Sequence, residues 1–459
     1  MQVEQGDGRM SMGKCRWEIL CETGAPGATG KVARTLPFRQ RAEKGFRRVR
    51  AKSFARTDQP PIENRNSTIG LYVHVPFCAV SCPYCDYPHT ANGRSSEARD
   101  AFVEALRAEV RRRERFHGAP VQTIYLGGGT PSQLAPAQLD QVLGALRNAF
   151  DADDAREITL EANPGDLTPG WLASVRALGV TRLSLGVQSF FAEDLSFLKR
   201  PHSAEETRNA IPTARAAGFR DVSADLLFGL PDQSLARWQA TLEQAAAQAT
   251  THVTLYRLTA EAGTPLGRRV AGGAVRLAGA DHATAQYERA LGVLSDAGFR
   301  LYEQTHLARP GCASTHMRRH WRHRTVLGFG PGAHSFFWKG EGGGRAVRRA
   351  NAPDWTAYVQ SGSSPSDAAP HTQETLPPDA LADEYVARRL RTAAGLSLHR
   401  LAERYDRDLR ARRGATLDRL CAEGYLEHAS ANDDDDERFC LTRSGRLRLN
   451  AMTGALVEG

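Results

Sequence analysis

Short β-rich runs alternate with amphipathic helical stretches from Ile69 onward, and this alternation constrains the fold of the 459-residue chain most strongly. Repeated strand–helix units predict a parallel sheet with helices outside it. Six or more units favour a complete or partial (β/α) barrel, which presents its functional side chains at the carboxyl ends of its strands. The expected strands are 71–75, 123–126, 158–162, 182–187, 222–228, 253–258 and 300–303. The expected helices are 95–114, 135–149, 168–177, 203–217, 234–248 and 279–297.

The composition is that of a globular protein with a sizeable core. Apolar residues make up 41% of the chain and charged residues 24%, which excludes a disordered or fibrous protein. No apolar run approaches the roughly 18–20 residues of a membrane span. The eight cysteines are irregularly spaced and do not form a disulfide framework, so we expect a reducing, cytoplasmic location.

The positive charge is confined to one end of the chain. The net charge is +8, but residues 1–66 hold 14 of the 60 Lys/Arg and only 7 of the 52 Asp/Glu. They account for +7, and residues 67–459 for +1. We therefore expect 1–66 to be a disordered basic extension and the main body to have no nucleic-acid partner. An arm that contacts nucleic acid or an anionic surface is the alternative.

Three further regions follow the extension. Residues 67–305 form the expected barrel core, and residues 306–375 a loop-rich region that closes the barrel and continues into a linker, since 361–380 is rich in Ser, Pro, Ala and Asp. Residues 376–459 combine helices with a β-ribbon, which predicts a winged-helix-like domain that caps the barrel or docks a partner.

A cysteine cluster follows the first expected strand. Cys78, Cys82 and Cys85 have the spacing C-x3-C-x2-C, and three thiolates so close together hold a soft metal centre. A structural zinc ion needs a fourth ligand, which His74 or His89 could supply. An iron–sulfur cube held by three cysteines instead leaves one iron open to a ligand, and the spacing favours this interpretation.

Other polar and glycine residues fall at the same predicted edge of the barrel. The run from Gly127 to Thr130 follows the second strand, Glu161 ends the third, Gln188 follows the fourth and Asp225 lies within the fifth. Because the carboxyl ends of the strands face one site, these residues are expected to converge beside the cysteines.

The sequence around the cysteines resembles the radical S-adenosylmethionine (SAM) superfamily. The matching runs are Tyr72-Val73-His74-Val75-Pro76-Phe77-Cys78 and Cys82-Pro83-Tyr84-Cys85-Asp86-Tyr87. Within the superfamily, residues 69–450 are similar to the branch that contains oxygen-independent coproporphyrinogen III dehydrogenases and the HemW heme chaperones. The resemblance implies a partial (β/α)6 barrel and a 4Fe–4S cluster whose open iron binds SAM. It also implies a reductant protein, and these SAM contacts: Tyr72, Tyr84, Gly128, Gly129, Thr130, Glu161, Gln188, Arg200 and Asp225.

Two features separate the chaperones from the dehydrogenases in this resemblance. Asp86 and Tyr87 follow Cys85, where the dehydrogenases continue with a fourth cysteine. The run from His316 to Trp321 resembles the chaperone motif H-N-x-x-Y-W, although Met317 replaces the asparagine and His320 the tyrosine.

The motif from His316 to Trp321 implies heme binding. His316 and His320 are the candidate iron ligands, with Arg318, Arg319 and Arg322 as partners for the propionates. The alternative is a structural loop that closes the barrel and covers the SAM site. Cys312 is a weaker candidate, because it lacks the C-x-x-C-H attachment pattern.

The resemblance therefore implies a heme chaperone that binds heme and passes it to acceptor proteins, including membrane-associated respiratory proteins. It assigns no catalytic residue and leaves open whether the chain is an enzyme. One rival function is an oxygen-independent coproporphyrinogen III oxidase, which decarboxylates propionates. The other is a radical SAM tRNA-modifying enzyme, which the sequence pI of 9.2 suggests.

Overall fold

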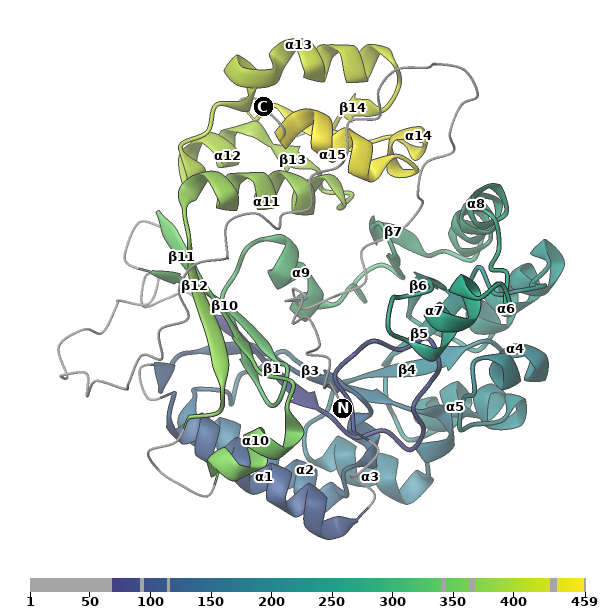
Figure 1. The fold of residues 1–459 in the computed structure, drawn as a ribbon, viewed down its shortest axis with the longest axis vertical. Coiled ribbons are helices and arrows are strands. Elements are labelled where there is room, and N and C mark those ends of the chain that lie inside the picture. The colour runs from purple at the N-terminus through teal and green to yellow at the C-terminus, as the bar shows by residue number, and fades with distance from the viewer. Residues whose placement is uncertain are drawn as a thin grey trace, which may run out of the picture.

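The computed structural model, shown in Figure 1, describes residues 68–90, 95–113, 116–339, 344–362, 368–429 and 436–457. The basic segment 1–66 lies outside these ranges. No helix within them is long and apolar enough to cross a membrane.

Six consecutive parallel strands form the centre of the molecule, in the order in which they occur in the sequence. The predicted alternation of strands and helices is confirmed, and each of the six strand predictions agrees with the structure to within two residues at either end. The strands are β1 (Ile69–Val75), β2 (Val121–Gly128), β3 (Glu157–Ala162), β4 (Arg182–Gln188), β5 (Asp221–Phe228) and β6 (His252–Arg257).

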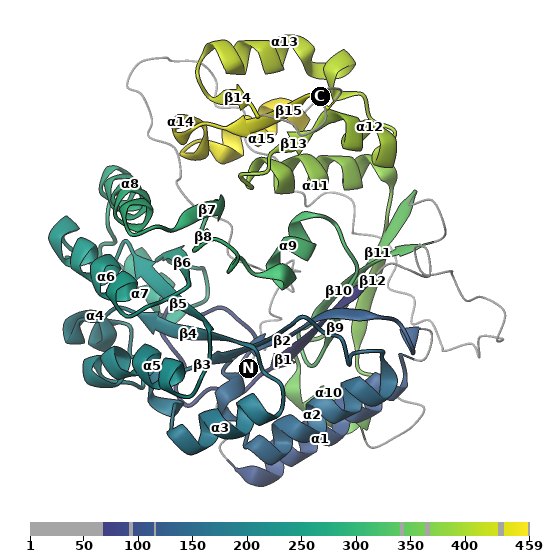
Figure 2. The same ribbon diagram turned by 180° about the vertical axis from the view of Figure 1, so that it is seen from behind.

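Helices cover the outer, convex side of this sheet (Figures 1 and 2). Several begin at a side-chain cap: Ser95, Thr168, Ser203 and Ser234 each accept a hydrogen bond from a backbone amide of the first turn. Between the layers lies a core of buried aliphatic and aromatic side chains. The α-helices of this layer are α1 (Ser96–Arg111), α2 (Pro136–Ala149), α3 (Pro169–Ala177), α4 (Ala192–Phe197), α5 (Ala204–Ala216), α6 (Leu235–Ala247) and α8 (Ala280–Asp296). Helix α7 (Pro265–Ala271) instead packs against the cysteine loop, where the Leu266 amide donates to the Pro83 carbonyl at 2.8 Å. Two 3-10 turns, η3 (Pro131–Gln133) and η4 (Pro164–Asp166), follow β2 and β3.

The sheet continues beyond the six strands on both sides and does not close, as expected for a partial barrel. Its strand order is β12-β11-β10-β9-β1-β2-β3-β4-β5-β6-β8-β7, so β12 and β7 are the two edges. The added strands are β7 (Arg300–Glu303), β8 (His306–Ala308), β9 (Val326–Phe329), β10 (His334–Lys339), β11 (Arg345–Asn351) and β12 (His371–Leu376).

The description of residues 306–375 as loop-rich is wrong. They contain β8 to β12 together with α9 (Thr315–Trp321) and α10 (Trp355–Gly362). The proposed linker 361–380 likewise contains β12, which pairs antiparallel with β11 along its whole length, and the start of the next helix. The sequences of β9 and β12 have no clear hydrophobic period, but pairing with β1 and β11 satisfies the hydrogen-bonding groups of their backbone.

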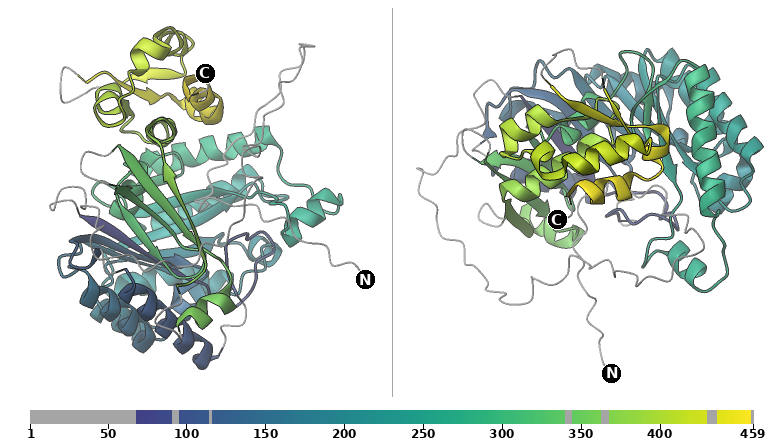
Figure 3. Two further views of the ribbon diagram at one scale, coloured as in Figure 1. Left: turned by 60° about the vertical axis from the view of Figure 1, so that its left-hand side comes forward. Right: turned by 90° about the horizontal axis from the view of Figure 1, so that it is seen from above.

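The C-terminal residues form a separate small unit that lies over one end of the sheet (Figure 3). It has its own apolar core, which includes Leu381, Leu401, Leu420 and Phe439, and a three-stranded sheet of order β13-β15-β14. This mixture of helices and a short ribbon agrees with the expected winged-helix-like architecture. Its elements are α11 (Pro378–Leu390), β13 (Leu396–Ser397), α12 (Leu398–Tyr405), α13 (Leu409–Ala422), β14 (Leu426–His428), β15 (Arg438–Leu441), α14 (Arg443–Arg446) and α15 (Leu449–Val457).

Candidate functional site

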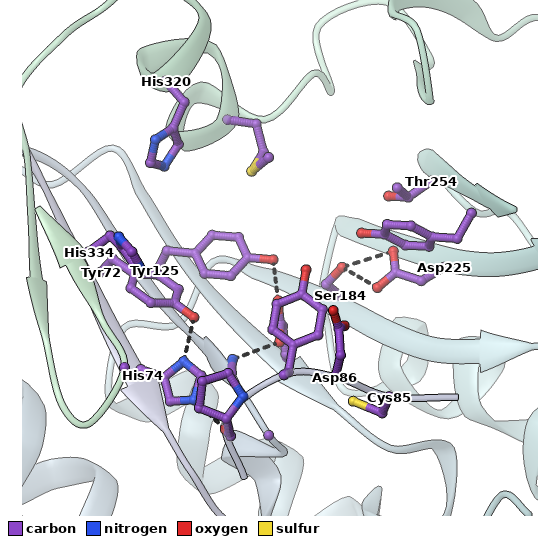
Figure 4. Close-up of a pocket in the computed structure, with 18 of the residues that line it drawn as sticks. Tyr72, His74, Cys85, Asp86, Tyr125, Ser184, Asp225, Thr254, His320 and His334 are labelled. Atoms are coloured by element: carbon purple, nitrogen blue, oxygen red, sulfur yellow. Dashed lines mark hydrogen bonds between the residues drawn. The ribbon is translucent and has the colours of Figure 1, made fainter. Parts of the chain in front are cut away.

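One large cavity of about 1290 Å³ occupies the concave side of the sheet. It extends from the cysteine loop, at the carboxyl ends of the strands, to α9 and the C-terminal unit. Pockets that hold one drug-sized ligand measure about 300–1,000 Å³, so this cavity has room for more than one small ligand. Figure 4 shows part of its lining, with His320 on one side and Cys85 on the other.

The three clustered cysteines line the cavity together. Thr130 Oγ1 donates to Cys78 Sγ at 3.5 Å, and Arg200 Nη1 lies 3.5 Å from Cys82 Sγ. Burial raises the pKa of the Cys78 thiol to about 11, so a thiolate at this position needs a bound cation to offset its desolvation. The donor set is that of a soft metal centre.

The two proposed fourth ligands of a zinc ion are otherwise engaged. His74 bonds the Pro88 carbonyl through Nε2 at 2.7 Å and the Tyr72 hydroxyl through Nδ1 at 3.1 Å. Both ring nitrogens of His89 are also hydrogen-bonded, at 2.7 Å each. Within the described ranges, no three His, Cys, Asp or Glu side chains converge on a single-ion site. An iron–sulfur cube, in which each cysteine binds a different iron, fits these residues better than zinc.

Two glycines let β2 approach the cysteine loop closely. Gly128 has a φ of +115°, and a Cβ there would lie 2.8 Å from the His74 ring. A Cβ on Gly129 would lie 2.7 Å from the Phe77 carbonyl oxygen and 3.0 Å from Cys78 Sγ. Side chains are therefore excluded at both positions, and backbone amides can face a ligand beside the cysteines.

Glu161 is the acidic group nearest to this glycine turn. Its Oε1 accepts from the Tyr125 hydroxyl at 2.7 Å and its Oε2 from the Gly128 amide at 3.2 Å. Burial, opposed by these two donors and reinforced by Asp225, raises the pKa of Glu161 to about 7. A cationic ligand group such as an ammonium would favour its ionised form.

The remaining predicted SAM contacts also line the cavity. Gln188 has a left-handed backbone with φ of +63°, a strain that is common at functional sites. Asp225 accepts from Ser184 Oγ at 3.1 and 3.2 Å (Figure 4), and burial raises its pKa. Arg200 donates to Asn163 Oδ1 and to the Gly186 carbonyl. The predicted set is thus brought together around one cavity.

At the other end of the cavity, α9 supplies two imidazoles. His316 bonds Thr123 Oγ1 through Nδ1 at 2.8 Å, while its buried Nε2 has no hydrogen-bond partner. Burial lowers the pKa of His316 well below its ordinary value, so the ring is neutral. With the proton on Nδ1, the lone pair on Nε2 is available to a metal. The His320 ring lies 5.3 Å from the His316 ring, and burial followed by Arg388 and Arg319 lowers its pKa to about 3.

Comparisons with known proteins agree with the fold and the site. Residues 72–245 match the radical SAM superfamily and residues 376–448 the HemN C-terminal domain. The chain is 34% identical over 390 residues to the heme chaperone HemW of Mycobacterium tuberculosis, covering 84% of this chain and 94% of that protein. The chain belongs to the HemW family.

Two further comparisons extend this assignment. The heme chaperone HemW of Bacillus subtilis is 29% identical to this HemW-family chain over 388 residues, which are 84% of this chain and 98% of that protein. The structure of coproporphyrinogen III oxidase (HemN) from Escherichia coli superposes with a TM-score of 0.71, covering 86% of this chain and 91% of that one. Its sequence identity is 22%, so this likeness supports the radical SAM fold alone.

In this HemW-family chain, α9 is anchored to the amino end of β3. Glu157, the first residue of β3, accepts hydrogen bonds from Ser314 Oγ at 3.0 Å, the Thr315 amide at 2.6 Å and the His316 amide at 2.9 Å. Because Glu157 lies at the amino end of its strand, these bonds hold α9 at the end of the sheet opposite the cysteines. Because Met317, His320 and Trp321 still line the same cavity as the cysteines, the alternative of a loop that closes the barrel and covers the SAM site stays a prediction.

The arginines expected to meet heme propionates are also placed differently. Arg319 is buried and donates to Gln122 Oε1 at 2.6 Å and to the Thr68 carbonyl. The Arg318 guanidinium lies 5.3 Å from the centre of the Tyr302 ring. Neither of them lines the cavity, and neither does Arg322.

Sequence reasoning did not identify several other charged and polar residues that line the cavity. Tyr125 carries no motif, although it follows the strand alternation that also brings Thr123 to the inner face. Arg348, Glu384 and Arg388 come from β11 and α11, which no spacing rule connects with α9. The residues that the sequence missed on the cavity wall include Tyr125, Arg348, Glu384 and Arg388.

Proposed function

We propose that this chain is a heme chaperone that holds heme in the cavity through an imidazole of α9 and passes it to acceptor proteins. The observation that carries the proposal is the buried Nε2 of His316, which lacks a partner and lies beside a cavity larger than one small ligand needs. The relatives from Mycobacterium tuberculosis and Bacillus subtilis are heme chaperones by name, which supports the same proposal.

The surroundings of His316 suit an iron ligand. Thr123 fixes the ring orientation through Nδ1, as second-layer hydrogen bonds do at metal-ligating histidines. Glu157 anchors the start of α9 by accepting hydrogen bonds from the Ser314 hydroxyl and from the amides of Thr315 and His316, so the sheet holds the backbone that carries the ring. His320 is half-buried on the same helix and is the second candidate ligand.

The cysteine end would hold a 4Fe–4S cluster on Cys78, Cys82 and Cys85, with SAM on the adjoining residues. When bound, these groups supply one-electron reduction and a source of radicals. The protein contributes the amides beside Gly128 and Gly129, and a carboxyl at Glu161 that can pair with an ammonium. In this proposal the chain works in the cytoplasm with a reductant protein, and its acceptors include membrane-associated respiratory proteins.

Heme titrations monitored at the Soret band test the proposal on wild type, His316→Ala and His320→Ala. We expect His316→Ala to weaken ferric heme binding at least about tenfold, since a lost iron ligand costs more than ~1.4 kcal/mol. His117→Ala is the matched control, because that imidazole bonds the Val110 carbonyl outside the cavity. Unchanged spectra in both α9 variants would remove these histidines as ligands.

Two further assays separate the chaperone from an oxidase. Heme-loaded protein mixed with an apo acceptor should lose its Soret signal to that acceptor. Anaerobic incubation with SAM, dithionite and coproporphyrinogen III should yield little protoporphyrinogen, because Tyr87 stands where the C-x-C motif of the dehydrogenases has its fourth cysteine. Robust product formation would instead establish the oxidase function.

A further inference from the structure

An ionic cluster lies on the cavity wall between the sheet and the C-terminal unit. Arg348 of β11 pairs with Glu384 of α11, and Arg388, one turn further along α11, has its Nη2 3.5 Å from the other oxygen of Glu384. His323 Nε2 lies 3.6 Å from Glu384 Oε2. The arginines and Glu384 all line the cavity.

The cluster is joined directly to the helix that carries the candidate heme ligands. Arg388 Nη1 donates to the His320 carbonyl oxygen at 2.7 Å. The guanidinium is therefore held beside the carboxyl-terminal turn of α9, one turn away from His316. SAM is expected at the opposite end of the cavity, beside Glu161, so its carboxylate is not the natural partner of this cluster.

The surroundings of the cluster are rich in positive charge. The pKa of Arg322 is lowered, first by burial and then by Arg318, Arg324 and Arg400. Burial would raise the pKa of Glu384, but His323, Arg388 and Arg348 lower it to about 2. Glu384 is therefore ionised at neutral pH, and a carboxylate in this position is strongly favoured.

We propose that Arg348 and Arg388 form a carboxylate subsite for one propionate of the tetrapyrrole, and that Glu384 occupies this subsite in the empty protein. The inference rests on the proposed function, which places a tetrapyrrole on α9. A guanidinium binds a carboxylate through two parallel hydrogen bonds, and a propionate offers the same group as Glu384.

The exchange of one carboxylate for another has a physical consequence for release. Removal of Glu384 without a replacement would take one carboxylate away from Arg388 and from Arg348, which keeps its pair with Glu374 at 3.0 Å. The loss of this negative charge from a partly desolvated wall is costly. A propionate that takes its place leaves the charge of the cluster unchanged. Glu384 therefore competes with the ligand, which limits affinity and favours the release that a carrier needs.

The test compares heme with heme dimethyl ester, whose propionates carry no charge, on the full-length chain. Soret titrations would use wild type, Arg388→Gln, Arg348→Gln and Glu384→Gln. We expect each arginine variant to bind heme about tenfold more weakly (~1.4 kcal/mol) and to bind the ester as wild type does. Glu384→Gln should bind heme several-fold more tightly, with no gain for the ester.

Arg443→Gln is the matched control, because Arg443 pairs with Glu288 at the surface at 3.0 Å and does not line the cavity. Arg388→Lys replaces the glutamine variant if that variant does not fold, because lysine keeps the charge but cannot form two parallel hydrogen bonds. It should weaken the binding of heme and leave the binding of the ester unchanged. Equal binding of heme and ester by wild type, with no effect of the arginine variants, would overturn the subsite and leave the chaperone proposal standing. Binding of neither ligand would overturn the chaperone proposal and this inference with it.

Discussion

Replacing Glu161 with Gln is expected to change how the stability of the chain depends on pH. Burial raises the pKa of Glu161 from 4.5 to about 7, against the hydrogen bonds from Tyr125 and Gly128. The folded chain thus keeps a proton that the unfolded chain releases above about pH 4.5. The stability that Glu161 contributes is complete below that pH and is lost as the pH rises through about 7.

The structure sets the size of this effect. One pKa unit corresponds to ~1.36 kcal/mol, so the interval from 4.5 to about 7 amounts to roughly 3 kcal/mol in the free energy of unfolding. Glu161 is half-buried on the cavity wall, and water in the cavity reduces the effect, so we expect about 2–3 kcal/mol. Glu161→Gln keeps the shape of the side chain and removes the titration.

The measurement is the melting temperature of both proteins, determined by calorimetry at a series of pH values from about 5 to 8. Wild type should lose stability relative to Glu161→Gln as the pH rises, by a few degrees in total. Glu104→Gln is the control, because that exposed carboxylate pairs with Arg107 on the surface of α1. Parallel curves for wild type and Glu161→Gln would refute the reasoning, since the carboxyl would then titrate as it does in the unfolded chain.

Two other substitutions test the two ends of the cavity. Gly129→Ala places a methyl group 2.7 Å from the Phe77 carbonyl and 3.0 Å from Cys78 Sγ, so the cysteine loop must shift at a cost of about 1–3 kcal/mol. Iron and sulfide per chain after anaerobic reconstitution should fall well below wild type, and full incorporation would contradict the close packing. Thr123→Val removes the partner of His316 Nδ1 while keeping its volume, so the iron–histidine stretch of bound heme should shift and Thr123→Ser should restore it. An unchanged iron–histidine stretch would show that Thr123 does not bond the imidazole that binds the iron.

The barrel was predictable because its signals are local. Each strand of the central sheet is a short apolar run that ends near a turn, and most of the helices between them begin at Ser, Thr or Pro. Parallel strands in sequence order then bring their carboxyl ends together. The cysteines, Glu161 and Gln188 could therefore be placed on one cavity from their positions relative to the strands alone.

The other end of the cavity depends on contacts between distant segments. β9 pairs with β1, with Val326 opposite Gly70, and nothing in the local pattern around Val326 indicates that partner. The position of α9 is set by Glu157 and Arg319, whose partners lie far away in the sequence. Sequence reasoning therefore identified the histidines of α9 but not the end of the barrel at which they lie.

Strand β2 connects the two ends through side chains that share its inner face. Thr123 and Tyr125 are two residues apart, so both lie on the inner face of the sheet, where Tyr125 lines the cavity. Thr123 bonds His316, while the Tyr125 ring lies 5.1 Å from the His316 ring and its hydroxyl donates to Glu161. A charge change at Glu161 thus acts on a side chain that packs against the candidate heme ligand. Because Tyr125 contacts both Glu161 and His316, we expect a ligand that displaces Glu161 also to change the packing of the His316 ring.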